Sequence, residues 1–167
     1  MEIRELTIDD LRSYKQIRLE GLKNNPTFFG SSYSEETRLS TQQWQERLKK
    51  QPNKLNLGLF YDNKLVSIIS LIQETKEKRK HCGTIFSVMT KEKYQHKGLA
   101  SILLGDLITR VDNSKKITIL TLKVGSSNYN AQKLYKKFGF VEIGTEVDSI
   151  KYKDNYYSMK IFQRVNH

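Results

Sequence analysis

Apolar residues recur three or four positions apart in four stretches of the chain, the spacing that brings side chains onto one face of a helix. The pattern is strongest after Gly98, where leucines recur at this spacing up to Val111. It is weakest between Ser34 and Lys49, so we expect that helix to lie over the edge of the core. The predicted helices span residues 11–24, 34–49, 98–111 and 128–138.

The hydrophobic period shortens to two after residue 54, which is typical of strands. Leu55, Leu57 and Leu59 alternate with other residues, and a polar turn at residues 62–64 then leads into the next strand. A β-branched run at residues 117–124 indicates a strand buried on both faces. The predicted strands span residues 2–7, 55–59, 65–74, 84–90, 117–124, 140–147 and 156–162.

The order of these elements places three consecutive strands before a single strand–helix–strand unit. This order indicates an α+β (mixed α/β) fold and disfavours a doubly wound one. We expect a central mixed, mostly antiparallel sheet of about seven strands flanked by about four helices. Because the chain has 167 residues and no evident linker or repeat, residues 1–167 are predicted to form a single domain.

Composition adds a strong positive charge, since 29 Lys and Arg residues oppose 18 Asp and Glu residues for a net charge of +11. This charge suits an anionic partner such as nucleic acid or a phosphorylated cofactor, and equally a solvated lysine-rich surface. Cys82 is the single cysteine, so neither an internal disulfide nor a cysteine zinc site is expected, and the three histidines have no metal-ligand spacing. With no signal peptide or long apolar run, the sequence predicts a cytoplasmic protein without a membrane partner.

The segment Gln95-His96-Lys97-Gly98-Leu99-Ala100 opens the strongest predicted helix and is the first candidate for chemistry. A turn here leaves backbone N–H groups unpaired at the positive end of the helix dipole, where phosphate binds well. Gly98 and Ala100 keep side chains small where a phosphate would approach. The plainer interpretation is a glycine that eases a loop into a helix. The chain contains neither a dinucleotide fingerprint nor a Walker A sequence, so a nicotinamide enzyme or a kinase is disfavoured.

Gln95 to Ala100 matches the acetyl-CoA loop Gln/Arg-x-x-Gly-x-Gly/Ala of the GCN5-related N-acetyltransferases, and Tyr94 before it is also typical. A second block runs from Leu122 through Asn128, Ala131, Leu134 and Tyr135 to Gly139-Phe140. It matches the family signature L-x-V-x-x-x-N-x-x-A-x-x-L-Y-x-x-x-G-F at every specified position. The chain therefore resembles this family over nearly its whole length. Glu92 stands where many members have proline, which weakens only the argument for a rigid loop.

The resemblance implies a set of residues that bind acetyl-CoA. The phosphates would meet the loop from Gln95 to Ala100, to which His96 adds a possible donor. The backbone of Val88, Met89 and Thr90 would bond to the pantetheine amides and polarise the thioester carbonyl. Asn128 would lie beside the pantetheine arm, although its residue type and position also suit a helix cap.

Tyr135 is the residue that we expect to act as the general acid. A thiolate leaving group has a pKa near that of cysteine, about 8.5, and a tyrosine hydroxyl with a pKa near 10 is able to protonate it. Tyr135 also falls on the apolar stripe of its predicted helix, so a purely structural role competes with the catalytic one.

Glu35 and Glu36 are weaker candidates for the catalytic set. A lysine-like amine is mostly protonated at neutral pH, and a carboxylate near the acceptor would take a proton or bind a cationic substrate. Both residues also suit the first turn of a helix, where Glu is electrostatically favoured. No Glu lies in the predicted strand 84–90, where some family members keep their base, so the base stays unassigned.

Together these features predict an N-acetyltransferase that moves the acetyl group of acetyl-CoA directly to a primary amine of a small molecule. An acetyltransferase acting on a protein N-terminus or lysine is the alternative, and a basic nucleic-acid-binding module is a more distant one. Against the last, the sequence lacks interleaved basic and aromatic residues on one strand, so no specific nucleic acid is expected. A homodimer is possible, and the sequence does not name the acceptor.

Overall fold

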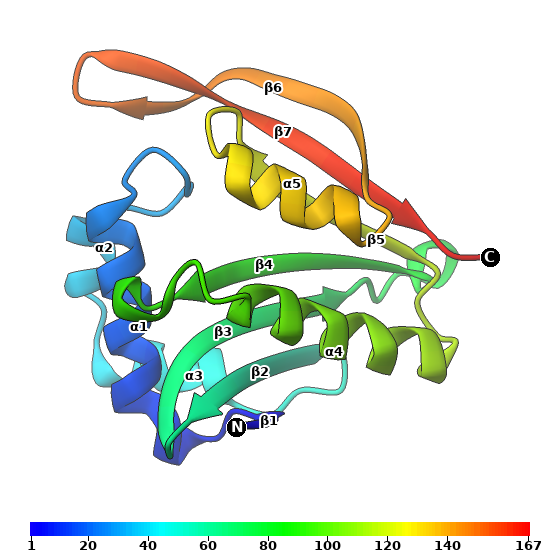
Figure 1. The fold of residues 1–167 in the computed structure, drawn as a ribbon, viewed down its shortest axis with the longest axis horizontal. Helices are drawn as coiled ribbons and strands as arrows, with labels where there is room; N and C mark the ends of the chain where they lie inside the picture. Colours follow the sequence, from blue (N-terminus) through cyan, green and yellow to red (C-terminus); the bar gives the residue numbers. More distant parts are fainter.

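The computed structural model describes residues 1–167 as seven strands and five α-helices in one sheet-centred fold (Figure 1). The strands are β1 (Glu2–Glu5), β2 (Lys54–Tyr61), β3 (Lys64–Gln73), β4 (Cys82–Thr90), β5 (Ile119–Gly125), β6 (Val141–Tyr152) and β7 (Asn155–Val165). The helices are α1 (Leu11–Asn24), α2 (Tyr33–Thr37), α3 (Thr41–Leu48), α4 (Leu99–Ser114) and α5 (Tyr129–Lys137). No helix combines the length and the apolar character needed to cross a membrane.

The sheet has the order β1-β2-β3-β4-β5-β7-β6. Every neighbouring pair is antiparallel except β4 and β5, which are parallel and joined by the α4 crossover. The predicted α+β class and mixed, mostly antiparallel sheet are therefore confirmed.

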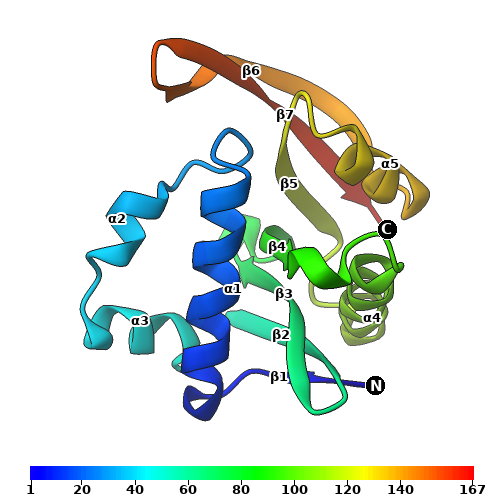
Figure 2. The same cartoon turned by 60° about the vertical axis from the view of Figure 1, so that its left-hand side comes forward.

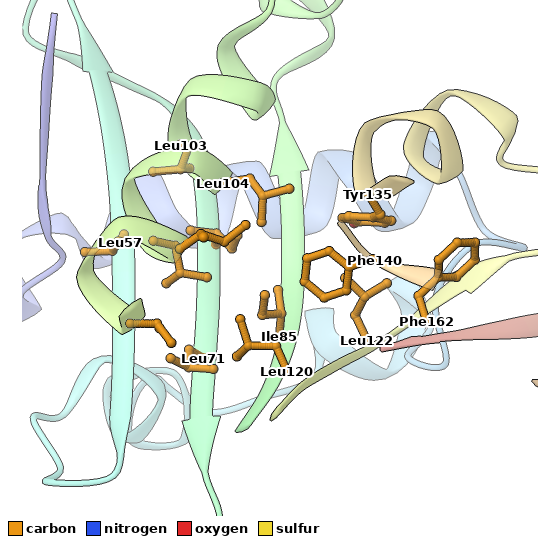
Figure 3. Packing of buried hydrophobic residues seen from close by; sticks show 14 of the residues in the cluster. Leu57, Leu71, Ile85, Leu103, Leu104, Leu120, Leu122, Tyr135, Phe140 and Phe162 are labelled. Atoms are coloured by element: carbon orange, nitrogen blue, oxygen red, sulfur yellow. The ribbon is translucent and has the colours of Figure 1, made fainter. Parts of the chain in front are cut away.

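Two hydrophobic clusters occupy opposite faces of the sheet. The larger cluster joins α4 and α5 to β2–β5 and β7, with Leu104 of α4 fully buried at its centre (Figure 3). The smaller cluster joins α1 and α3 to the other face and is built around Ile17 and Trp44. In Figure 1, α4 and α5 accordingly lie in front of the sheet and α3 lies behind it. Because strand side chains alternate between faces, neighbours such as Ile68 and Ile69 belong to different clusters.

The single helix predicted at residues 34–49 is wrong, because the structure has two short helices there, α2 and α3. The physical reason is a second helix start. Ser40 accepts a hydrogen bond from the Gln43 N–H at 3.1 Å, and the Gln43 side chain accepts one from the Ser40 N–H at 2.8 Å. This reciprocal capping pair begins α3 and ends the preceding turn. The last hairpin is also longer than predicted, since β6 and β7 continue to Tyr152 and Val165.

Candidate active site

The parallel strands β4 and β5 pair over only three residues each, and this short pairing creates the site. Cys82 to Thr84 pair with Ile119 to Thr121, and beyond them β5 keeps only its bonds to β7. Figure 2 shows β5 and β7 inclined away from β3 and β4. The edge of β4 from Ile85 to Thr90 therefore has no strand partner on the side of β5.

A bulge in β4 lies at the start of this opening. Ile68 pairs with Met89 and Ser70 pairs with Phe86, so β4 has one residue more than β3 between these two pairs. Ser87 within the bulge has a φ of 54°, a left-handed conformation that is uncommon for residues other than glycine. Such bulges bend a strand and redirect its side chains, and they are frequent beside active sites.

A cleft of about 920 Å³ lies in the opening. Its walls come from β4, β5, the start of α4, α5, and α1 with the loop that follows it, and a few residues of α3, β2, β6 and β7 complete the lining. The residues predicted to bind the cofactor that line it are Val88, Met89, Thr90, Gln95, His96, Gly98, Leu99, Ala100, Asn128 and Tyr135. Lys97, Glu35 and Glu36 do not line it.

The start of α4 carries a run of free backbone donors at one end of the cleft. The N–H groups of residues 96–101 donate no hydrogen bond within the chain, and the first helical bond joins the Ile102 N–H to the Gly98 carbonyl at 3.1 Å. Ser32, Ser40 and Asn128 cap α2, α3 and α5 with their side chains, whereas α4 begins at Gly98 without a capping side chain. The longest helix of the chain therefore presents its positive end and unpaired donors to any anion that enters.

The loop before α4 is held in place by its own contacts. The Gln95 side-chain amide donates to the Thr90 carbonyl at 3.0 Å, so Gln95 ties the loop to the end of β4. His96 has a φ of 59° and Gly98 a φ of 75°, and two left-handed residues so close together curve the backbone and turn its N–H groups outward. Lys93 and Lys97 lie 5.9 and 5.5 Å from the centre of the Tyr94 ring and add positive charge beside the loop.

Tyr135 combines a buried ring with an accessible hydroxyl. Its ring lies near those of Phe140 and Phe162 (Figure 3). The ring centres are 6.0 Å apart for Phe140 and 6.5 Å apart for Phe162. Burial raises the pKa of Tyr135, so the hydroxyl keeps its proton at neutral pH. The hydroxyl makes no hydrogen bond within the chain. Because the Trp44 indole nitrogen is the only fully buried side-chain polar atom without a hydrogen-bond partner, the Tyr135 hydroxyl oxygen is not fully buried. The Tyr135 hydroxyl therefore borders the open space of the cleft that this residue lines.

Asn128 is a helix cap, because its side-chain oxygen accepts a hydrogen bond from the Ala131 N–H at 3.3 Å. It also lines the cleft, and its amide nitrogen donates no hydrogen bond within the chain. Thr90 is linked to Ser67 by a hydroxyl contact of 2.8 Å, and Met89 is buried against α1. These contacts fix the strand whose free edge borders the opening.

The Glu35 and Glu36 carboxylates form hydrogen bonds and ion pairs away from the cleft. Glu35 completes the capping pair of α2, with 3.1 Å bonds in both directions to Ser32. Glu36 is 2% exposed and forms ion pairs with Arg18 and with Arg47, the latter at 3.0 Å. Neither carboxylate faces the cleft, so this geometry gives them structural roles.

Several residues that the sequence did not single out lie on the cleft wall. Arg18, Arg47 and Lys54 line it on the side of α1, α3 and β2. Ser101 lies in the first turn of α4 beside the free donors. Glu146 is the one acidic residue on the wall, and the Lys123 ammonium binds it at 2.6 Å.

The sequence could have indicated the role of Glu35, because a serine followed three residues later by glutamate is typical of a capping box. No local pattern in the sequence indicated that Arg18 and Arg47 would lie together at the cleft.

Comparison with known proteins agrees with this geometry. The acetyltransferase (GNAT) domain family matches residues 23–154. The chain therefore belongs to the GCN5-related N-acetyltransferase family and is an acyltransferase, as its two motifs predicted. That family takes its acetyl group from acetyl-CoA.

Among individual proteins, the chain is 29% identical over 126 residues to the L-amino acid N-acetyltransferase AaaT of Escherichia coli (strain K12), covering 73% of this chain and 77% of that protein. A GNAT-family acetyltransferase from Streptococcus pneumoniae has a TM-score of 0.83 at 22% identity, over 99% of each chain. A ribosomal-protein-alanine N-acetyltransferase from Brucella melitensis has a TM-score of 0.81 at 19% identity, again over 99% of each chain. At such identities the two structures show a shared fold only.

Proposed function

We propose that this enzyme transfers the acetyl group of acetyl-CoA to a primary amine of a small molecule. The observation that carries the proposal is the uncapped start of α4, whose free N–H groups at residues 96–101 lie at one end of the cleft between β4 and β5. The similarity to an L-amino acid N-acetyltransferase supports a small acceptor.

The residues present fit the chemistry of coenzyme A. Its pyrophosphate is an anion, and the backbone donors around Gly98 with the ammonium groups of Lys93 and Lys97 supply positive potential for it. Its pantetheine arm carries two amides, which match the unpaired backbone edge of β4 at Val88, Met89 and Thr90 in the manner of an added strand. His96 borders the phosphate end and is able to donate one further hydrogen bond.

The chemistry requires little beyond positioning and one proton donor, because the thioester arrives already activated. The amine nitrogen bonds to the acetyl carbon while the carbon–sulfur bond breaks. The amine loses a proton, and the departing thiolate needs one. Tyr135 is our candidate donor, since its hydroxyl borders the cleft and is protonated at neutral pH. Burial raises the pKa of Tyr135, which by itself makes the hydroxyl a weaker acid, so the case for Tyr135 rests on its position.

A protein acceptor is the second candidate function. The ribosomal-protein-alanine N-acetyltransferase of Brucella melitensis shares the fold, and a protein N-terminus presents the same primary amine. A panel of free amino acids, simple amines and short peptides distinguishes the two, with CoA thiol release as the readout. We expect turnover with free small amines. Turnover restricted to peptides would refute the small-molecule proposal.

The cellular setting and assembly remain sequence-based proposals. Cys82 is free and partly buried, which suits a reducing compartment such as the cytoplasm. The homodimer likewise stays a prediction.

A further inference from the structure

We propose that the amine acceptor carries a carboxylate, and that Arg47 and Lys54 bind this carboxylate on the cleft wall formed by α1, α3 and β2. The inference rests on the proposed function, because it names the class of small molecule that the same cleft accepts.

The wall on this side of the cleft carries an excess of positive charge. Arg18, Arg47 and Lys54 all line the cleft here, and Glu36 behind them is the only carboxylate that pairs with any of the three. The cleft's acidic residue, Glu146, belongs to β6 and is bound to Lys123. A cationic acceptor such as a polyamine would meet like charges on this wall, whereas an acceptor with a carboxylate would neutralise one of them.

Arg18 and Glu36 form a buried, hydrogen-bonded ion pair that holds this wall of the cleft in place. The Arg18 guanidinium bonds to Glu36 through Nε and Nη2, and its Nη1 donates to the Ser87 hydroxyl at 2.8 Å. Each of its three nitrogens is therefore engaged. Because Ser87 lies in the bulge of β4, this contact also connects the charged wall directly to the strand edge that borders the opening.

The Arg47 guanidinium has N–H groups that are not bonded to a carboxylate. Its Nη1 donates a hydrogen bond at 3.0 Å to Glu36, and the Tyr14 hydroxyl also lies close to the guanidinium, while no second carboxylate pairs with it. The guanidinium carbon lies over the Trp44 ring, 4.7 Å from its centre, and this cation–π contact helps to position the group. A planar guanidinium with free N–H groups, held in place and facing a cleft, is suited to binding a carboxylate.

Lys54 has no acidic partner at all. Its ammonium donates to the Arg47 carbonyl oxygen at 2.8 Å, and no carboxylate forms an ion pair with it. Burial and, after it, the neighbouring Arg47 charge lower the pKa of Lys54. A half-buried cation beside another cation is unfavourable unless an anion joins them. A substrate carboxylate between Arg47 and Lys54 would supply that anion.

The test compares acceptors that differ only in this group. A free amino acid and its carboxamide present the same primary amine on the same side chain, and a diamine of similar length supplies a cationic comparison. We expect kcat/KM to be about tenfold or more higher for the acid than for the carboxamide, and lowest for the diamine, as the loss of one charged hydrogen-bonded contact implies.

Variants assign the preference to named residues. Lys54→Met keeps the aliphatic stem and removes the charge, and it should raise KM for the acid about tenfold while KM values for the carboxamide and for acetyl-CoA stay unchanged. Arg47→Gln should act in the same direction, although it also removes a partner of Glu36. Lys49→Gln is the matched control, because Lys49 follows Arg47 closely in the chain but is exposed and outside the cleft.

Equal kcat/KM for acid and carboxamide, or a preference that survives Lys54→Met in a folded variant, would overturn the inference and leave the proposed function standing. Acetylation of peptides but of no small amine would instead refute the proposed function itself. The two failures are therefore distinguishable in one set of assays.

Discussion

Replacement of Gly98 by glutamate tests whether the start of α4 binds the phosphates of acetyl-CoA. A Cβ built on Gly98 meets no heavy atom within 4 Å, so the first side-chain atom has room at this position. The φ of 75° costs any other L-residue about 1–2 kcal/mol, a cost that Gly98→Glu and Gly98→Gln share. The difference between these two variants therefore isolates the effect of the carboxylate charge.

The expected magnitude follows from the free donors at residues 96–101. A carboxylate about 5 Å from one phosphate charge, at an effective dielectric constant of about 20, opposes binding by about 3 kcal/mol. Gly98→Glu should therefore bind CoA about 100-fold more weakly than Gly98→Gln. Added salt should narrow the gap, because screening shortens the reach of the repulsion.

Titration calorimetry with CoA measures these affinities directly, and thermal melting of each variant confirms that it is folded. The reasoning is refuted if folded Gly98→Glu and Gly98→Gln bind CoA with equal affinity at low ionic strength. That result would place the phosphates away from the start of α4.

Three further predictions concern the chemistry and the stability of the fold. Tyr135→Phe keeps the packed ring and removes the hydroxyl, so kcat should fall about 100-fold or more while CoA affinity measured by calorimetry changes little; unchanged turnover under conditions where chemistry limits the rate would exclude Tyr135 as the acid. Hydrogen bonds from arginines lower the pKa values of Asp10 and Asp112, so the stabilisation from these pairs is present above the usual aspartate pKa and is lost as pH falls below it; urea melts between pH 6 and pH 2.5 should show the loss, and Asp112→Asn should flatten it. Leu104→Ala removes a fully buried side chain of α4 and should lower the free energy of unfolding by about 3 kcal/mol, whereas Ile102→Ala on the exposed side of the same helix should change it by about 0.5 kcal/mol or less; equal effects would contradict the assigned core.

Local signals in the sequence predicted the parts of the fold that depend on short stretches. The free start of α4 follows from Gly98 and its neighbours, and the cap at Asn128 follows from one residue type before a helix. The break at Ser40 was equally local, since a serine followed three residues later by glutamine indicates a new helix start. The weak apolar stripe of residues 34–49 concealed it.

The charged wall of the cleft depends on contacts between distant parts of the chain and could not be predicted in the same way. Arg18 and Glu36 are 18 positions apart, and Arg18 and Ser87 are 69 apart. Glu36 and Ser87 are compatible with a solvated surface when their own helix or strand is considered alone. Arg18 lies on the inward stripe of its helix with Tyr14 and Leu22, but that stripe does not indicate its partners. The packing of α1 against the bulge of β4 buries Arg18 beside Ser87, and the contacts of α3 with Glu36 and with Lys54 of β2 complete the charged wall.

Acetyl transfer to a small amine is tested most simply by a turnover assay with the purified protein, acetyl-CoA and a panel of small primary amines, with the products identified by mass spectrometry. We expect stoichiometric release of the CoA thiol together with a gain of one acetyl group on the amine nitrogen of a small acceptor. Binding of CoA without acetylation of any small amine in the panel, alongside acetylation of a peptide N-terminus, would contradict this expectation.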